Sequence, residues 1–179
     1  MKLSVGRLPH GPRNQITDVP GVRVGHCTVD REDCHTGVTV ILPPPANPFT
    51  EKLTAAAFVW NGFGKSQGLV QVEELGTLET PIALTNTLNV GKVHDAMVSV
   101  MLDWCRRDGV KLTSVNPVVL ECNDSSISDI ARRPVGEAEV RAGYMLYAER
   151  LSGEAVRLQD QLTEILAGID ADIDLPEED

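Results

Sequence analysis

Short apolar segments rich in β-branched residues recur along the first 120 residues of the chain and predict β-strands. In VRVGHCTV, residues 22–29, apolar and polar positions alternate as in a half-buried strand, and Pro20 and Gly21 mark a turn before it. The run GVTVILP, residues 37–43, is stopped by prolines, and we expect these two strands to pair. Further strands are predicted at the start of residues 55–65, at 80–86 and at 115–120.

Two segments between the later strands have helical spacing. Residues 68–75 form a short candidate helix that Gly76 closes as a C-cap. Residues 90–106 place their large apolar side chains on one side and their charged residues on the other. The apolar set is Val93, Met97, Val100, Met101 and Trp104. Strands interleaved with helices predict an α/β or α+β layered domain over residues 1–141.

A different pattern begins after Ala142 and predicts one amphipathic helix over residues 142–169. Its apolar residues are spaced by three and four, as in the seam of a heptad repeat. They are Ala148, Leu151, Ala155, Leu158, Leu162, Ile165 and Ile169. Such a stripe can dock on the chain's own core or contact another subunit, because both need the same spacing. Residues 170–179 are expected to form an acidic tail.

The charge of the chain excludes some classes of partner. The net charge is −10, and residues 141–179 supply −7 of it, from ten acidic and three basic residues. An acidic chain without a Lys/Arg cluster repels phosphate groups, so we expect neither nucleic acid nor membrane as a partner. No long apolar run and no signal peptide are recognisable, which predicts a cytoplasmic protein.

The four cysteines are therefore expected to be reduced thiols. Cys27 and Cys34 stand beside His26 and His35, and zinc binds such side chains. Adjacent residues on a strand point to opposite faces, however, and the paired CxxC spacing is absent. We expect no metal site.

Polar side chains gather where the apolar run VVL opens into ECNDSSISD, within residues 118–129. A buried strand that ends in polar groups commonly delivers them to the rim of a pocket. Glu121 could bind a substrate ammonium group or act as an acid or base, and Asn123 could donate to an oxyanion. Asp124 and Asp129 are expected to play supporting parts, as caps of the turn and of the segment at Ile130. Cys122 lacks a recognisable Cys/His signature for a nucleophile.

Two further segments carry candidate binding groups. Gly62 and Gly64 lie in GFGKS, which lacks the spacing of a phosphate loop. Their backbone N–H groups could still bind an oxyanion, and the alternative is a tight turn. In TNTLN, residues 85–89, Asn86 is our candidate for the pocket, although asparagine also caps helices and favours turns.

These segments together resemble the DmpA family of aminopeptidases, which includes the β-peptidyl aminopeptidases. The matching blocks occur in the same order over residues 4–141. They are NQITDVPGVRVGHCTV, TGVTVILP, FVWNGFGKSQGLVQVEELGTLETPIALTNTLNVG and SVNPVVLECND.

The resemblance implies a layered α/β sandwich shared with ornithine acetyltransferases, present here in part and with an added C-terminal amphipathic helix. It also implies hydrolysis of short peptides, amides or esters with a free amino end, without cofactor or metal. The nucleophile of the family is a serine at a new N-terminus created by self-cleavage. Glu121 falls on the acidic position of the family's GExND-like motif, and Asn61, Asn86 and Asn123 fall on family-like positions.

Departures from the family pattern concern the catalytic half of the site. Leu120 and Ser125 stand where glycines are expected, and Ser126 replaces an aromatic residue. A glycine-rich GAGTG segment and the serine-initiated strand are not found, and Ser152 and Thr163 lie inside the heptad pattern. We therefore expect no catalytic nucleophile in this chain.

Three interpretations follow. In the first, the chain is the N-terminal part of a DmpA-like hydrolase, which acts with a second catalytic segment or as a homo-oligomer. In the second it is a non-catalytic amine-binding or regulatory relative, and in the third it is a truncated product. The regular heptad stripe argues against a frame-shifted product. The first interpretation predicts a peptide or amide substrate held by this chain.

Overall fold

The computed structural model describes residues 6–44 and 46–145 as a mixed α+β fold, which confirms the predicted fold class. The elements are, in chain order, η1 Ile16–Asp18, β1 Arg23–Arg31, β2 Cys34–Leu42, β3 Leu53–Thr54, β4 Ser66–Gln67, α1 Leu69–Leu75, β5 Thr77–Leu78, β6 Ile82–Asn86, η2 Thr87–Asn89, α2 Val90–Arg107, β7 Val118–Cys122 and η3 Ile130–Arg132. Residues 137–145 are also helical.

The main sheet has the strand order β1-β2-β6-β7-β4, and β3 and β5 form a separate two-stranded sheet. The predicted pairing of β1 with β2 is confirmed, since the two strands form an antiparallel hairpin. Strands β6 and β7 are parallel and are joined through α2, whereas β4 runs antiparallel to β7. The carboxyl ends of β6 and β7 therefore lie side by side at one edge of the sheet.

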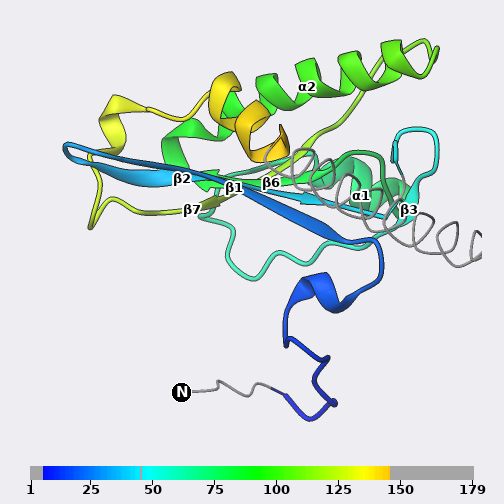
Figure 1. The fold of residues 1–179 in the computed structure, drawn as a ribbon, viewed down its shortest axis with the longest axis horizontal. Helices are drawn as coiled ribbons and strands as arrows, with labels where there is room; N and C mark the ends of the chain where they lie inside the picture. Colours follow the sequence, from blue (N-terminus) through cyan, green and yellow to red (C-terminus); the bar gives the residue numbers. More distant parts are fainter. Residues whose placement is uncertain (1–5, 45, 146–179) are drawn as a thin grey trace, which may run out of the picture.

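One face of the sheet packs on α2. The five apolar residues predicted to face the core from this helix are all buried, and Met97 and Met101 are completely enclosed. They contact strand residues such as Val40 and Val119 in one continuous core. Figure 1 shows α2 and the helical residues 137–145 on the same side of the sheet.

Residues 137–145 cross the expected boundary at 141 and pack closely on the hairpin. A Cβ atom at Gly25 would lie 1.8 Å from the carbonyl oxygen of Gly143, so only glycine permits this approach. The rings of Trp104 and Tyr144 lie 5.0 Å apart, and Val140 is fully buried in the core. The heptad positions from Ala148 onward, and the acidic tail, lie outside the described residues.

The opposite face of the sheet is covered only in part. Because side chains alternate along a strand, Val118 and Leu120 point away from Val119 and from α2. Val118 packs with Val72 of α1 and with Leu78 of β5 in a smaller apolar cluster. Farther along the same face, His26 and Thr28 of β1 are exposed. The hairpin thus presents an uncovered sheet surface among the described residues.

The predicted strand at the start of residues 55–65 is wrong. Pairing of β3 with β5 ends where the Ala55 N–H donates to the carbonyl oxygen of Gly76, at 2.9 Å. Gly76 is the C-cap of α1 and has a φ of +64°. The backbone before β5 is therefore not extended, and it offers no strand with which residues after Ala55 could pair. Phe58 and Trp60 consequently remain 82% and 89% exposed.

The predicted strand at 115–120 begins later, at Val118. Pro117 has no N–H to donate to a ladder, which accounts for this start. The strand continues through Glu121 and Cys122, so the acidic residue lies within the strand rather than beyond it. None of the helices among the described residues is long and apolar enough to cross a membrane.

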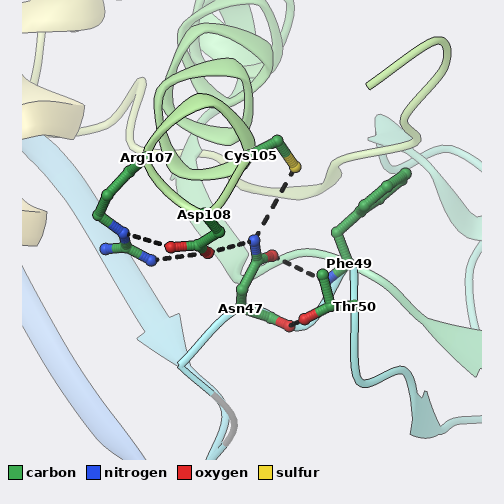
Figure 2. A network of polar contacts seen from close by, with 6 residues as sticks. All are labelled: Asn47, Phe49, Thr50, Cys105, Arg107 and Asp108. Atoms are coloured by element: carbon green, nitrogen blue, oxygen red, sulfur yellow. Dashed lines mark hydrogen bonds and ion pairs between the residues drawn. The ribbon is translucent and has the colours of Figure 1, made fainter. Parts of the chain in front are cut away.

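A polar network anchors the loop after β2 to the end of α2 (Figure 2). The amide nitrogen of Asn47 donates to Asp108 at 2.8 Å and also approaches the sulfur of Cys105. The amide oxygen of Asn47 accepts from the Phe49 N–H at 3.1 Å. Arg107 donates to both carboxylate oxygens of Asp108, at 2.7 and 2.9 Å. A single buried amide thus connects two elements far apart in sequence.

Replacing Asn47 with alanine should lower the free energy of unfolding by about 1–3 kcal/mol, because the Phe49 N–H loses its acceptor and Asp108 loses one of its two donors, keeping only Arg107. The measurement is urea denaturation followed by circular dichroism. Asn123→Ala is the control, because Asn123 is exposed and makes one local hydrogen bond to Ser125. Equal losses in the two variants would contradict the anchoring role.

Candidate functional site

Glu121 lies where the two parallel strands of the sheet end together. In the register of β6 and β7, Thr85 is opposite Glu121 and Asn86 is opposite Cys122. The next residue on the β6 side, Thr87, begins the turn that leads into α2. Ends of adjacent parallel strands bring side chains from distant segments together, as ligand sites in open α/β sheets require.

The glycine loop approaches Glu121 from the other side. Strand β4 pairs with β7 so that Ser66 is opposite Leu120, which brings Lys65 and Gly64 alongside Glu121. A Cβ atom built on Gly64 would lie 3.5 Å from Oε1 of Glu121. Sequence segments separated by more than fifty residues therefore meet at this carboxylate.

The Lys65 side chain does not form an ion pair with Glu121. Its Nζ atom donates to the carbonyl oxygen of Phe63 at 3.1 Å and lies 4.1 Å from the centroid of the Phe63 ring. The charge is thereby directed onto its own loop. Glu121 keeps its carboxylate available for another cation.

The surroundings of Glu121 favour its ionised form. Burial raises the pKa of this carboxyl, but the Thr87 hydroxyl, the Lys65 N–H and the Lys65 charge together lower the pKa below its ordinary value. Among the described residues, however, Oε2 of Glu121 and Oγ1 of Thr87 are both shielded from solvent without a hydrogen bond of full geometry. We conclude that the two groups are close but that their hydrogen-bonding capacity is not used up.

An ionised carboxylate with an unfilled acceptor is suited to binding a donor cation. Unsatisfied buried acceptors cost free energy, so a ligand that supplies N–H groups is stabilised there. A protonated amine supplies up to three such groups together with the complementary charge. The arrangement can thus hold and orient an ammonium group at the edge of the sheet.

Asn86 has a structural role in the described fold, and its place in a pocket stays a prediction. The residue is only 2% exposed, and its Oδ1 atom accepts from the Asn89 N–H at 3.1 Å. Its amide nitrogen donates to the Thr36 hydroxyl at 2.9 Å. Both polar ends of the side chain are therefore engaged within the protein, and Asn86 caps the turn before α2.

Asn61 and Asn123 are exposed and form local turns. Oδ1 of Asn61 accepts from the Phe63 N–H at 2.9 Å, and Oδ1 of Asn123 accepts from the Ser125 N–H at 3.0 Å. These contacts shape the glycine loop and the segment after β7. The amide groups are held near Glu121 by chain connection, so donation to an oxyanion stays a prediction for Asn123 and for the N–H groups of Gly62 and Gly64.

Asp124 and Asp129 lie in the segment that follows β7. The Asp124 carbonyl oxygen accepts from Ile127 and Ser128, and its Oδ1 atom is buried without a partner among the described residues. Asp129 caps η3, because its Oδ1 atom accepts from the Ala131 N–H at 3.1 Å. The capping prediction is confirmed for Asp129.

Two residues of this neighbourhood were not singled out from the sequence. Thr87 lies inside the TNTLN segment, where only Asn86 was considered as a candidate for the pocket. Lys65 lies inside GFGKS, where the lysine suggested a phosphate loop that the spacing excludes. The register between β4, β6 and β7 is what brings both to Glu121, and a single sequence does not contain that register.

The chain is similar to several solved structures. The chain is similar to the PH0078 protein from Pyrococcus horikoshii OT3, with a TM-score of 0.74 and 44% identity over 80% of this chain and 43% of that one. It is also similar to a β-aminopeptidase from Burkholderia sp., with a TM-score of 0.70 and 40% identity over 79% and 40% of the two chains.

A third solved relative defines the fold class. The L-aminopeptidase D-Ala-esterase/amidase from Ochrobactrum anthropi has a TM-score of 0.71 and 32% identity, over 78% of this chain and 41% of that one. It is described as a prototype for the serine aminopeptidases and as a variant of the Ntn-hydrolase fold. The described fold is thus that of part of a serine-aminopeptidase-type Ntn hydrolase.

The family is shown by the sequence itself. The sequence profile of Peptidase family S58 matches residues 14–156, and the chain belongs to this family. β-Peptidyl aminopeptidase BapA of Sphingosinicella xenopeptidilytica is 36% identical over 67% of this chain, and that of Sphingosinicella microcystinivorans is 35% identical over the same share. The match spans only 32% and 31% of those relatives, so the chain corresponds to about a third of their length. The resemblance to the DmpA-type aminopeptidases is confirmed.

Proposed function

We propose that this chain is the amine-binding part of an S58-type aminopeptidase or amidase. Glu121 holds the free ammonium group of a short peptide, amide or ester, and Asn123 with the glycine loop lies beside the bond to be cleaved. The serine nucleophile comes from a second segment that this sequence does not contain. No metal or cofactor takes part in the proposed reaction.

The observation that carries this proposal is the state of Glu121. The pKa of its carboxyl is lowered, one of its oxygens is buried without a partner among the described residues, and the Lys65 side chain is directed elsewhere. A purely structural carboxylate in this protein looks different. Glu79 is 5% exposed and binds Lys52 at 2.6 Å and the Asn116 N–H at 3.0 Å.

The need for a second segment is supported by an apolar surface that is exposed in the part of the chain that the structure describes. Phe58, Trp60 and Phe63 are 78–89% exposed in the loop between β3 and β4, whose last residues lie alongside Glu121. Large aromatic side chains gathered on a surface commonly mark an interaction site. The solved relatives are more than twice as long as the matched region, so they possess further chain that can cover this surface. A homo-oligomer is the other source of cover, and the four free thiols fit the proposed cytoplasmic location.

Hydrolysis assays on the purified chain test this proposal. The chain is incubated with short peptide amides and esters, alone and together with the protein encoded by the neighbouring gene, and release of the N-terminal residue is measured. We expect no release by the chain alone and release by the mixture. Iodide quenches the fluorescence of exposed tryptophan side chains such as Trp60. We expect less quenching in the mixture, because the second segment covers Trp60 in the complex.

The alternatives give other results. Release by the chain alone would contradict the assignment of the nucleophile to a second segment. No hydrolysis in either mixture, with amine binding that Glu121→Gln abolishes, would favour a non-catalytic amine-binding relative. The substitutions Leu120, Ser125 and Ser126 in the motif are the specific observation in favour of that second candidate.

A further inference from the structure

Three buried threonines lie in or next to β6, and their hydroxyl groups differ in their hydrogen bonds. Thr80 donates its hydroxyl to the carbonyl oxygen of Pro81 at 2.8 Å, and Thr85 donates to the carbonyl oxygen of Gly37 at 3.1 Å. Thr87 is 8% exposed, and among the described residues its hydroxyl makes no hydrogen bond of full geometry, although it acts on the ionisation of the Glu121 carboxyl. Buried hydroxyl groups are normally satisfied, so the remaining hydrogen-bonding capacity of Thr87 is available to a ligand.

The two unfilled acceptors belong to residues that the strand register brings near each other. Thr85 is opposite Glu121 in the parallel pair β6 and β7, and Thr87 follows at the end of β6. Oε2 of Glu121 and Oγ1 of Thr87 are both shielded from solvent. A hydroxyl has one hydrogen to donate and two lone pairs to accept with. When the hydrogen of Thr87 turns to Glu121, its lone pairs remain, and the pair of side chains then presents acceptors only.

We propose that Thr87 is a specificity-determining residue of the Glu121 site, which accepts one N–H of a primary ammonium group and so selects it over N-methylated amines. This inference rests on the proposed function, because it assumes that Glu121 binds the amine. A primary ammonium has three N–H groups and can serve the carboxylate and the hydroxyl together. An N,N-dimethylated ammonium has one N–H, which the carboxylate takes.

The test compares glycinamide with 2-(dimethylamino)acetamide, which carries two methyl groups on its amino nitrogen, by NMR chemical-shift titration of the whole chain. These probes differ in their methyl groups and have no stereocentre. We expect the wild-type chain to bind glycinamide at least about tenfold more tightly, as one hydrogen bond to a charged donor would provide. Thr87→Val keeps the shape but removes the hydroxyl, and it should reduce that ratio about tenfold. Thr87→Ser restores the hydroxyl and should restore the ratio.

Two control variants separate this role from a structural one. Thr85→Val removes a buried hydroxyl that is already bound to Gly37, and it should leave the ratio unchanged. Glu121→Gln should weaken both probes, which tests the proposed function independently. Two outcomes for Thr87→Val would overturn the Thr87 inference while Glu121→Gln still abolishes binding. In one, the variant binds both probes more weakly by the same factor. In the other, the ratio of the two dissociation constants is unchanged. Equal binding of both probes by the wild-type chain overturns it as well, and no binding at all overturns both proposals.

Discussion

Shortening Met97 to alanine should lower the free energy of unfolding by roughly 2–5 kcal/mol, the usual range for truncating a fully buried large side chain. Met97 lies in the middle of α2, has no exposed surface and packs in the core between this helix and the sheet. The truncated side chain leaves a cavity, and the neighbouring side chains of the sheet cannot move fully into it. Urea denaturation followed by circular dichroism measures the loss.

Leu102→Ala is the matched control for this prediction. Leu102 lies on the same helix but is 41% exposed, so its truncation removes less buried surface and leaves no enclosed cavity. We expect a loss of no more than about 1 kcal/mol for this variant. Similar losses for the two variants would mean that α2 does not pack on the sheet as described.

The helix and the hairpin could be predicted because their signals are local. The side chains that recur at helical spacing in α2 are the ones that the core buries, and the alternation in β1 matches its pairing with β2. Gly76 ends α1 with a positive φ, as a glycine at this position predicts. In these elements, local preference and tertiary packing agree.

The errors have long-range causes. The apolar run after Ala55 favours burial, but its strand partner ends at Gly76, and a sequence does not show where a partner ends. The burial of Glu79 has a similar long-range cause, because Lys52 and Asn116 from other segments bind its carboxylate. Burial of a charged side chain depends on partners from other segments, so periodicity within one segment cannot reveal it.

The candidate site also contains residues with a local sequence signal and residues whose position depends on long-range contacts. Glu121 was predicted from an apolar run that opens into polar residues, and the structure places it where two parallel strands end. Asn86 was assigned to a pocket. In the structure its side-chain oxygen accepts from the Asn89 N–H, which is the local capping interaction that asparagine commonly makes at the start of a helix. Thr87 was not singled out because its importance comes from an unfilled hydrogen bond beside Glu121, which only the folded chain defines.

Replacing Glu121 with glutamine should weaken the binding of glycinamide by roughly ten- to hundredfold, because a charge-assisted hydrogen bond becomes a neutral one. Glutamine keeps the size of the side chain but also brings two donors, which face the N–H groups of the ligand instead of accepting from them. NMR titration of wild type and variant at pH 7 gives the two dissociation constants. Glu74→Gln is the control, since Glu74 is exposed on α1 and its replacement changes the net charge equally.

The pH dependence of binding distinguishes a direct role of Glu121 from a general effect of charge. Binding requires an ionised carboxylate and a protonated amine. The pKa of Glu121 is lowered from 4.5, so the carboxylate remains ionised throughout the neutral range and affinity falls only when the pH drops below that lowered pKa. On the alkaline side, affinity falls as the amine loses its proton near pH ~8, the usual range for an α-amino group. In Glu121→Gln the acidic limb should disappear while the alkaline limb remains, and an unchanged acidic limb would assign the titrating group to another residue.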